Sequence, residues 1–502
     1  MVWLMRRLHL RAAASFDLLI AMLFLLSATN SVCAAGPSTT IPAPQAVPPL
    51  VHPAAPAGVI GAQPLPPLKL PQHFENDPKV VASQLNKLIE RAVANNPDLL
   101  AANYAVEAAA HRVLPAGMPE DPYVGYRMKD LPTTFSMKRE NATERQVEVS
   151  QRYPFPGKLG LRQAIASKQE YVVRAERRAA LLHLVTGVRL AFAEIFTIDK
   201  DIQLALEQRR MLRELRAIAL SKYQLGPGLQ QDVLNADVAL AQIDTQLIDL
   251  TRKRRSRLIR LEVLLNQPAV EVPAVGTLPP AALRFPTEQL EEMALAANPE
   301  IQHLGRSVER DTLNQRLAER APLPDILLYG AYGSRDDHPG KTTTSAGKTT
   351  TSGAAFRPDL ITAQIMLDLP VFYFSKQREQ LYEAQATLRH TRARMAAARD
   401  TVLGALHDIL ARLAEHEQVA HSYEREVIPL ASSEVAAAIS AYRVDRVDFL
   451  TLLAAQDNLD KYEAAYWRNE ADRFRDLAEI DEVTGAAFPS EASAVAVSSA
   501  IR

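Results

Sequence analysis

A repeated block of sequence is the feature that most constrains the fold of this chain. Residues 88–99, LIERAVANNPDL, recur as residues 290–301, LEEMALAANPEI, and Pro122 recurs as Pro324 at the same spacing. Self-similarity at a fixed spacing indicates an internal duplication, so the second half should repeat the order of elements in the first. We expect a helix, two strands, a very long helix, a turn and another long helix in each half.

Long helices are the clearest signal in both halves. Apolar residues follow a four-three spacing over Leu181–Leu206 and again over Val233–Leu265. A seam that repeats every 3.5 residues makes two helices wrap around each other. The segment Leu159–Lys222 contains no proline and only two glycines, and as a helix it would extend roughly 95 Å. Gly226-Pro227-Gly228 and the stretch Arg443–Asp448 should break the long helices, so each half should contribute one helical hairpin.

Two short segments in each half have the period of a β-strand. Apolar and mostly polar residues alternate over Ile361–Leu369 and over residues 146–150, and the aromatic-rich segments 123–129 and 325–333 precede them. Strands of roughly ten residues match the length needed to cross a bilayer at a tilt.

Four strands cannot close a barrel alone. Open sheet edges in lipid would leave backbone groups unpaired at a cost of several kcal/mol each. Three copies of the chain would supply 12 strands (3 × 4), which is within the known range of such barrels. The predicted fold is therefore mainly α with a small β portion: long coiled-coil hairpins plus four transmembrane strands per chain, in a trimeric 12-stranded barrel with an α-helical tunnel.

The N-terminus has the layout of an exported protein. Arg6, Arg7 and Arg11 precede an apolar run from Leu18 to Leu26, which at about nine residues is too short to span a membrane. We found no later stretch long enough for a spanning helix, so we expect strands to make any membrane crossing. The predicted organisation is a signal peptide (1–35), a Pro/Ala-rich tether (36–75), two structural repeats (76–285 and 286–484) and a flexible C-terminal tail (485–502).

Cys33 is the only cysteine, and two interpretations of it remain open. Cleavage after Ala34 or Ala35 would discard the thiol, whereas lipidation would make Cys33 the first residue of a lipoprotein. Neither leaves a disulfide in the mature chain. The formal net charge is -1, which gives no global field of the kind expected from a protein that binds nucleic acid.

Several motifs resemble the TolC family of outer-membrane efflux proteins. They are the duplicated Asn-Pro elements, the run Val149–Leu159 (VSQRYPFPGKL), Tyr223-Gln224-Leu225-Gly226 leading to Asp232-Val233-Leu234, and Leu367–Phe372. The resemblance covers about residues 76–484. The form YPFPGK at Tyr153–Lys158 is similar to the heavy-metal branch of that family, the CzcC- and CusC-like proteins.

This resemblance implies a homotrimer in the outer membrane with a helical tunnel in the periplasm. Such a channel contacts outer-membrane lipid and joins an inner-membrane RND-type pump through a periplasmic adaptor, the membrane fusion protein. It also implies that the hairpin tips face the adaptor and narrow the tunnel. The tip residues are Tyr223, Gly226, Gly228, Asp232, Tyr442, Arg443, Asp445, Arg446 and Asp448.

A second group of residues should form the bend between barrel and tunnel: Pro154, Phe155, Pro156, Gly157 and Pro370. Proline is tolerated in the first helical turn, and glycine permits unusual backbone angles.

At the tips, charged groups would either close the pore through salt bridges or attract cations to a carboxylate ring. The plainer interpretation is that these charged groups are solvated turn residues.

We predict neither a metal site nor a cofactor. His416 and His421 lie five apart, on different faces of a helix, and Met118, Met128 and Met137 are scattered as packing residues usually are. The segment Gly340–Ser352 contains Gly-Lys-Thr twice but lacks the first glycine and the strand-to-helix context of a phosphate loop. We interpret it as an external barrel loop. No catalytic constellation is recognisable, so we do not expect an enzyme.

Other functions compete with a metal efflux duct. The same architecture suits the outer-membrane duct of a type I protein secretion system or of a drug efflux system. A periplasmic coiled-coil adaptor would need one hairpin with compact β domains, whereas this sequence predicts two hairpins and paired strands. A purely structural filament would not need the alternating strands.

Overall fold

The computed structural model describes residues 70–71, 73–131, 133, 135, 143–226, 228–279, 282–283, 285–337, 342–345, 348–351, 353 and 356–485. The described residues all belong to one compact unit, residues 67–502. The predicted signal peptide, most of the predicted tether, the tail beyond Gly485 and Cys33 lie outside the described residues.

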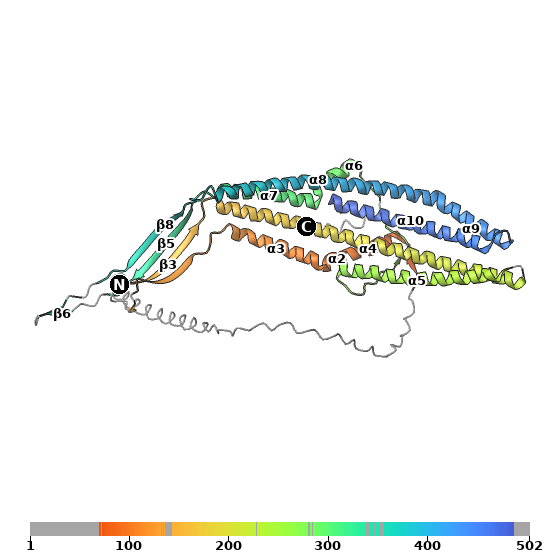
Figure 1. The fold of residues 1–502 in the computed structure, drawn as a ribbon, viewed down its shortest axis with the longest axis horizontal. Helices are drawn as coiled ribbons and strands as arrows, with labels where there is room; N and C mark the ends of the chain where they lie inside the picture. The colour runs from red at the N-terminus through yellow and green to blue at the C-terminus, as the bar shows by residue number, and fades with distance from the viewer. Residues whose placement is uncertain are drawn as a thin grey trace, which may run out of the picture. The chain divides into compact units, whose positions relative to one another are not determined.

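The described residues repeat one order of elements (Figure 1). The first series comprises α2 (Pro78–Asn95), α3 (Pro97–Ala116), β2 (Tyr123–Lys129), β3 (Glu144–Tyr153), α4 (Lys158–Leu225) and α5 (Gln230–Leu265). The second comprises α6 (Thr287–Ala297), α7 (Pro299–Glu319), β5 (Asp325–Ser334), β8 (Leu360–Asp368), α8 (Gln377–Ser422), the π-helix η1 (Tyr423–Val427), α9 (Ile428–Arg443) and α10 (Phe449–Thr484). A mainly helical fold with few strands is confirmed.

The segment before each strand pair was predicted as one helix, and this was wrong, because it is two helices. Asn96 separates α2 from α3, and Asn298 separates α6 from α7. Each asparagine accepts hydrogen bonds from the second and third amides of the helix that follows, and a proline occupies the first helical position, where its missing N–H costs nothing. The repeated Asn-Pro is therefore a helix cap in both halves.

The two asparagines also make the same tertiary contact. Asn96 Nδ2 donates to the carbonyl of Leu264 at 3.0 Å, and Asn298 Nδ2 donates to the carbonyl of Val483 at 2.8 Å. Leu264 and Val483 lie at the ends of α5 and α10, where helical carbonyls lack partners within the helix. In each repeat the Asn-Pro cap is thus hydrogen-bonded to the last turn of that repeat's own hairpin.

Helix α4 is the core of the first half, and it corrects one expectation. By length and composition it alone among the described helices could cross a membrane, since an 18-residue window has a mean hydropathy of 1.6. However, 72% of that window is buried inside the protein. Phe192, Ile195 and Phe196 are fully buried in a cluster that includes residues of α2 and α5. The apolar run therefore belongs to the core.

The strands form one four-stranded antiparallel sheet in the order β2-β3-β5-β8. Its central pair, β3 and β5, joins the two repeats, with Val149 opposite Gly330. Figure 1 shows the sheet at one end of the helices and both hairpin turns at the other. Among the described elements, α3 packs on α4, α4 on α7 and α7 on α8, while α10 packs on α4 and α8.

Three smaller features were not predicted. A parallel pair, β1 (Phe74–Glu75) and β4 (Ala274–Val275), joins the start of the described chain to the connection after α5. Within the Gly-Lys-Thr tandem repeat two short strands, β6 (Thr342–Ser345) and β7 (Lys348–Thr351), pair antiparallel. The π-turn η1 interrupts the second long helix just before Pro429, whose ring cannot continue a regular helix.

Candidate functional site

The sheet has one apolar face. Side chains of directly opposed residues lie on the same face of an antiparallel sheet, and the register aligns Tyr126, Val147, Tyr332 and Ile361 in one row. All four are exposed, Ile361 to 84%. Further exposed apolar residues on this face are Val124, Val149, Leu328, Ile365 and Leu367. An exposed apolar surface of this kind requires a partner or a lipid environment.

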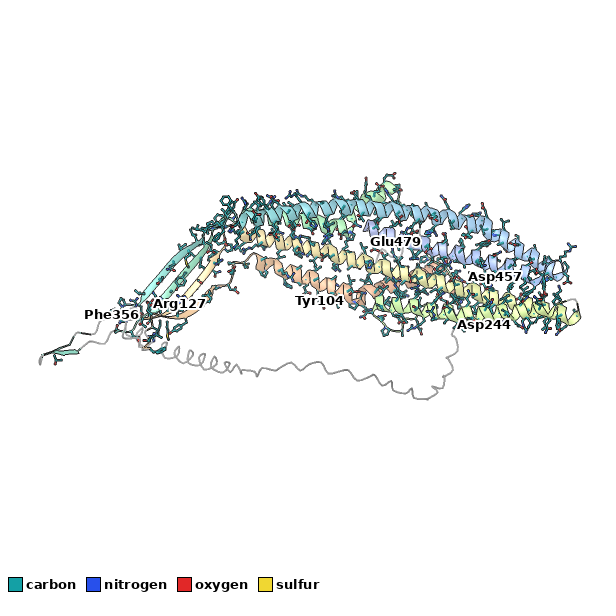
Figure 2. The ribbon with its side chains drawn as sticks, in the orientation of Figure 1. Tyr104, Arg127, Asp244, Phe356, Asp457 and Glu479 are labelled. Carbon is teal, nitrogen blue, oxygen red and sulfur yellow. The ribbon has the colours of Figure 1, made fainter. Side chains whose placement is uncertain are left out.

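The opposite face of the sheet is polar and internally paired. Glu144 and Glu148 are 1% and 5% exposed. Glu148 forms an ion pair with Arg127 at 3.0 Å and accepts a hydrogen bond from Tyr329 at 2.8 Å. Glu144 forms an ion pair with Arg335 at 3.2 Å. Figure 2 shows Arg127 on this sheet. Apolar and polar faces back to back are the pattern of a strand that separates lipid from a water-filled channel.

The predicted bend lies where β3 becomes α4. Gly157 has a φ of +88° and precedes the first residue of α4, so glycine avoids the strain that a Cβ would bring there. A Cβ at this position would also lie 1.8 Å from Nη1 of Arg320, on the C-terminal end of α7. Lys158 was missed by the sequence analysis. It is 6% exposed and pairs with Asp325 of β5 at 2.8 Å, and Asp325 also accepts the Phe155 amide at 2.9 Å.

Pro370 occupies the equivalent connection in the second half, between β8 and α8. The residues that follow it are unusually exposed and apolar: Val371 to 76%, Phe372 to 69% and Phe374 to 70%. The Arg378 guanidinium lies 5.5 Å from the Phe374 ring centroid. This connection therefore places exposed apolar side chains between the sheet and the helices.

The predicted tip residues lie at or beside the turn between α4 and α5 and the turn between α9 and α10. Tyr223 lies in the last turn of α4, and Gly226 and Gly228 follow that helix; Gly226 has a φ of +103° and closes α4. Arg443 and Arg446 on the second turn are exposed and form no ion pair with any described residue. Asp448 caps α10 by accepting the Thr451 amide at 3.0 Å. Hydrogen bonds from Thr451 lower the Asp448 pKa.

A hydrogen-bond network joins the two tips. Tyr442 is 3% exposed and its hydroxyl donates to Asp232 Oδ2 at 3.0 Å. Lys222, which the sequence analysis missed, donates to the carbonyl of Tyr442 at 2.7 Å and pairs with Asp445. Burial, followed by the hydrogen bond to Asp232, raises the Tyr442 pKa, so the hydroxyl keeps its proton. The structure thus brings Asp232, Tyr442 and Asp445 together, and Lys222 contacts both Tyr442 and Asp445.

Ionisable groups also line the contact between α4 and α10. Lys200 is 5% exposed, its Nζ lies 3.8 Å from the Trp467 ring centroid, and burial lowers its pKa. On α10, burial raises the Asp460 pKa to about 7. The hydrogen bond from Gln456 lowers this pKa, whereas repulsion from Glu463 and other nearby carboxylates raises it further. This contact should therefore respond to pH near neutrality.

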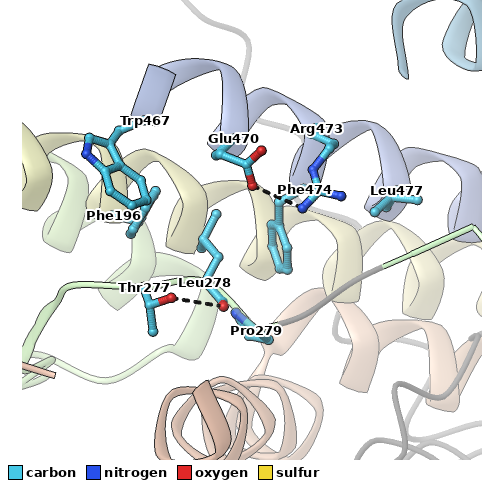
Figure 3. A pocket seen from close by; sticks show the side chains of 9 residues that line it. All are labelled: Phe196, Thr277, Leu278, Pro279, Trp467, Glu470, Arg473, Phe474 and Leu477. Atoms are coloured by element: carbon cyan, nitrogen blue, oxygen red, sulfur yellow. Dashed lines mark hydrogen bonds and ion pairs between the residues drawn. The ribbon is translucent and has the colours of Figure 1, made fainter. Parts of the chain in front are cut away.

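A small cavity lies beside this contact (Figure 3). Its volume is about 90 Å³, and Phe196, Trp467, Phe474 and the connection Thr277–Pro279 line it. Ligand pockets usually measure about 300 Å³ or more. We therefore interpret this cavity as a packing feature of the core.

The described residues contain no group of three or more histidine, cysteine or acidic side chains placed to hold a metal ion. His416, which the sequence analysis considered, instead contacts Asp476 at 2.7 Å. Met137 lies outside the described residues, while Met118 and Met128 are exposed.

Comparison with known proteins gives one family match. Residues 88–267 match the family described as Outer membrane efflux protein. No curated protein matches the sequence.

Solved structures resemble nearly the whole described unit. CusC has a TM-score of 0.66 at 15% identity, over 84% of this chain and 98% of CusC. VceC of Vibrio cholerae has a TM-score of 0.66 at 17% identity, over 81% and 97% of the two chains. The MtrE outer membrane channel of Neisseria gonorrhoeae, in its open state, has a TM-score of 0.62 at 17% identity, over 80% and 89%. Residues 88–267 therefore match the outer membrane efflux protein family, and the described unit shares the fold of these solved outer-membrane proteins.

Proposed function

We propose that three copies of this chain share one 12-stranded barrel, that their helices continue it as a tunnel, and that the assembly is the passive exit duct of a tripartite efflux system. The family match over residues 88–267 supports a location in the outer membrane, with a helical extension into the periplasm. The observation that carries the proposal is the sheet β2-β3-β5-β8. Its outer strands, β2 and β8, each have one edge that no described strand covers.

The two faces of the sheet support this arrangement. An apolar face with Val124, Ile361 and Ile365 exposed is suited to lipid, whereas Glu144, Glu148 and their arginine partners are suited to a water-filled lumen. Edges that stayed open in lipid would each cost several kcal/mol per unpaired group. Pairing β8 of one subunit with β2 of the next removes both edges at once.

The tips are proposed as the periplasmic aperture and the contact for the adaptor. Hydrogen bonds between Tyr442 and Asp232, together with the pair of Lys222 with Asp445, hold the second hairpin against the first. Loss of these contacts would free α9 and α10 to move away from α4. Arg443 and Arg446, which are exposed at the same end, are left for contacts with an adaptor.

The proposed partners are a periplasmic adaptor and an inner-membrane RND-type pump. For the substrate we propose heavy-metal cations, because the form YPFPGK at Tyr153–Lys158 is similar to the heavy-metal branch. The alternatives are drug efflux and type I protein secretion, which the same fold would serve. A conduit needs no tight site for its cargo, and specificity then lies in the pump.

The assembly is tested by fractionation and gel mobility. We expect the protein in the outer-membrane fraction as a trimer that dissociates on heating in detergent. A soluble periplasmic monomer would refute the duct. The substrate is tested separately by growth of a deletion strain on copper, cobalt, zinc, silver and common drugs. Sensitivity to drugs alone would refute the metal assignment and leave the duct intact.

The aperture is tested by single-channel conductance in planar bilayers. Asp445→Ala removes the partner of Lys222, and Asp448→Asn removes a charge while keeping a group that can cap α10. We expect the double variant to change conductance and cation preference. Glu434→Ala, an exposed carboxylate on α9, is the matched control. Equal conductance of the double variant and the wild type would remove the role of these carboxylates in gating.

A further inference from the structure

A second, larger cavity lies between α3, α4 and α7. Its volume is about 310 Å³, within the range of small-molecule sites. Three of its nine lining residues are arginines, one from each helix: Arg112 from α3, Arg162 from α4 and Arg310 from α7. None of the lining residues is acidic. Three guanidinium groups around one cavity favour an anionic ligand.

The charges of these arginines are only partly compensated. Arg310 forms an ion pair with Asp311 at 2.8 Å, and its Nη1 donates to Gln169 Oε1 at 2.7 Å. Asp311 is 2% exposed and also accepts a hydrogen bond from Thr391. Arg112 and Arg162 are exposed and form no ion pair with any described residue, although Arg162 lies within electrostatic reach of the Asp325 carboxylate. Two positive charges without an ion-pair partner among the described residues therefore line the cavity beside one anchored guanidinium.

The remaining lining residues define the shape of a ligand. Gln169 uses its carbonyl for Arg310, which leaves its amide N–H groups to donate, and Asn314 supplies a second side-chain amide. Ala109, Ile165, Ala166 and Leu317 form an apolar wall. Arginine forks and amide donors suit phosphate oxygens, and an apolar wall suits a hydrocarbon part of the same molecule.

The position of the cavity agrees with this chemistry. The lining residues lie on α3, α4 and α7, each within about three turns of the helix end that adjoins the sheet. These ends connect to β2, β3 and β5, respectively. If the sheet spans the membrane, as the proposed function holds, the cavity lies just below the periplasmic surface of the bilayer. Phosphate groups of lipids are concentrated at that depth.

We propose that this cavity binds the phosphate group of an amphiphilic phosphate ester. The arginines and amides hold the phosphate oxygens, and the apolar wall takes the adjoining hydrocarbon. The same oxyanion chemistry is offered by the head group of an anionic phospholipid and by free phosphate passing along the protein. The site does not depend on transport, so its test is separate from that of the duct.

The test measures binding to the full-length purified protein by native mass spectrometry in a neutral polyoxyethylene detergent. The probes are dihexanoyl phosphatidylglycerol and dihexanoyl phosphatidylcholine, each alone and with inorganic phosphate as competitor. The test variant is Arg112→Gln with Arg162→Gln. The matched control is Arg91→Gln with Arg316→Gln, two exposed arginines on α2 and α7 that do not line the cavity.

We expect phosphatidylglycerol to bind at least tenfold more tightly than phosphatidylcholine, and the test variant to lose that preference while the control keeps it. If millimolar phosphate displaces phosphatidylglycerol, a soluble oxyanion is an equally good ligand of the cavity. If phosphatidylglycerol stays bound, the ligand is the lipid. Equal binding of both lipids, or no difference between test and control variants, would overturn the proposal. If the double variant does not assemble, Arg112→Gln and Arg162→Gln are measured singly, since they lie on different helices.

Discussion

Replacing Asn96 with alanine should destabilise the protein through two separable losses. The side chain caps α3, accepting the amides of Asp98 at 2.9 Å and Leu99 at 3.1 Å. Loss of such a cap costs about 1 kcal/mol. Its Nδ2 also donates to the carbonyl of Leu264, and loss of this bond at a 7% exposed residue costs about 1–2 kcal/mol. The expected total is roughly 2–3 kcal/mol.

Asn96→Asp separates the two losses, because a carboxylate still caps α3 but cannot donate to Leu264. It should therefore fall between the wild type and Asn96→Ala. The neighbouring Asn95, which is exposed, provides the control Asn95→Ala, with an expected effect below about 0.5 kcal/mol. The measurement is urea unfolding in detergent followed by circular dichroism at 222 nm. Equal midpoints for Asn96→Ala and Asn95→Ala would refute the dual role of the cap.

Three further outcomes follow from single sites. Gly157→Ala should lower the heat-dissociation temperature of the trimer, since a Cβ at φ +88° is strained by about 1 kcal/mol and must displace Arg320; an unchanged temperature would contradict this. Tyr442→Phe should raise the open-channel probability, because a hydrogen bond to the Asp232 carboxylate is worth about 1.5–3 kcal/mol; an unaltered single-channel record would count against it. Asp460 has a raised pKa in the folded protein, so its ionised carboxylate destabilises the fold. This destabilisation is absent below pH 3.8, grows up to about pH 7 and is complete above pH 7. Asp460→Asn should therefore stabilise the protein at pH 8, by about 1–2 kcal/mol after allowance for solvent screening, and leave it unchanged at pH 4; the same gain at both pH values would argue against the assigned cause.

Elements with a strong periodic pattern were predictable from the sequence. The helix predicted over Leu159–Lys222 is α4, and the strand predicted over residues 123–129 is β2 with the same ends. In α4 the local pattern and the tertiary burial agree. The break at Asn96 was missed although its signal was present, because asparagine followed by proline is a common helix start.

Contacts between distant parts of the chain were not predictable. Lys222 meets Tyr442 across 220 positions, and Lys158 meets Asp325 across 167. No local pattern encodes such a pair, since both partners look like ordinary solvated residues until the two hairpins or strands pack. Turns that close equivalent hairpins lie at the same end of the helices, so the repeat indicates that the tip residues are neighbours, but their interactions required the structure.

The central claim, a barrel shared between subunits, is tested most directly by disulfide formation between the sheet edges. Cysteine replaces Val124 on β2 and, in a series of double variants, Ile361, Ala363, Ile365 or Leu367 on β8, in a Cys33→Ser background. Within one chain β2 and β8 are three strand spacings apart, roughly 14 Å, which is too far for a disulfide. We predict that oxidation of at least one double variant produces a covalent trimer that withstands heating under non-reducing conditions. Monomeric chains after oxidation of every variant would contradict the shared barrel.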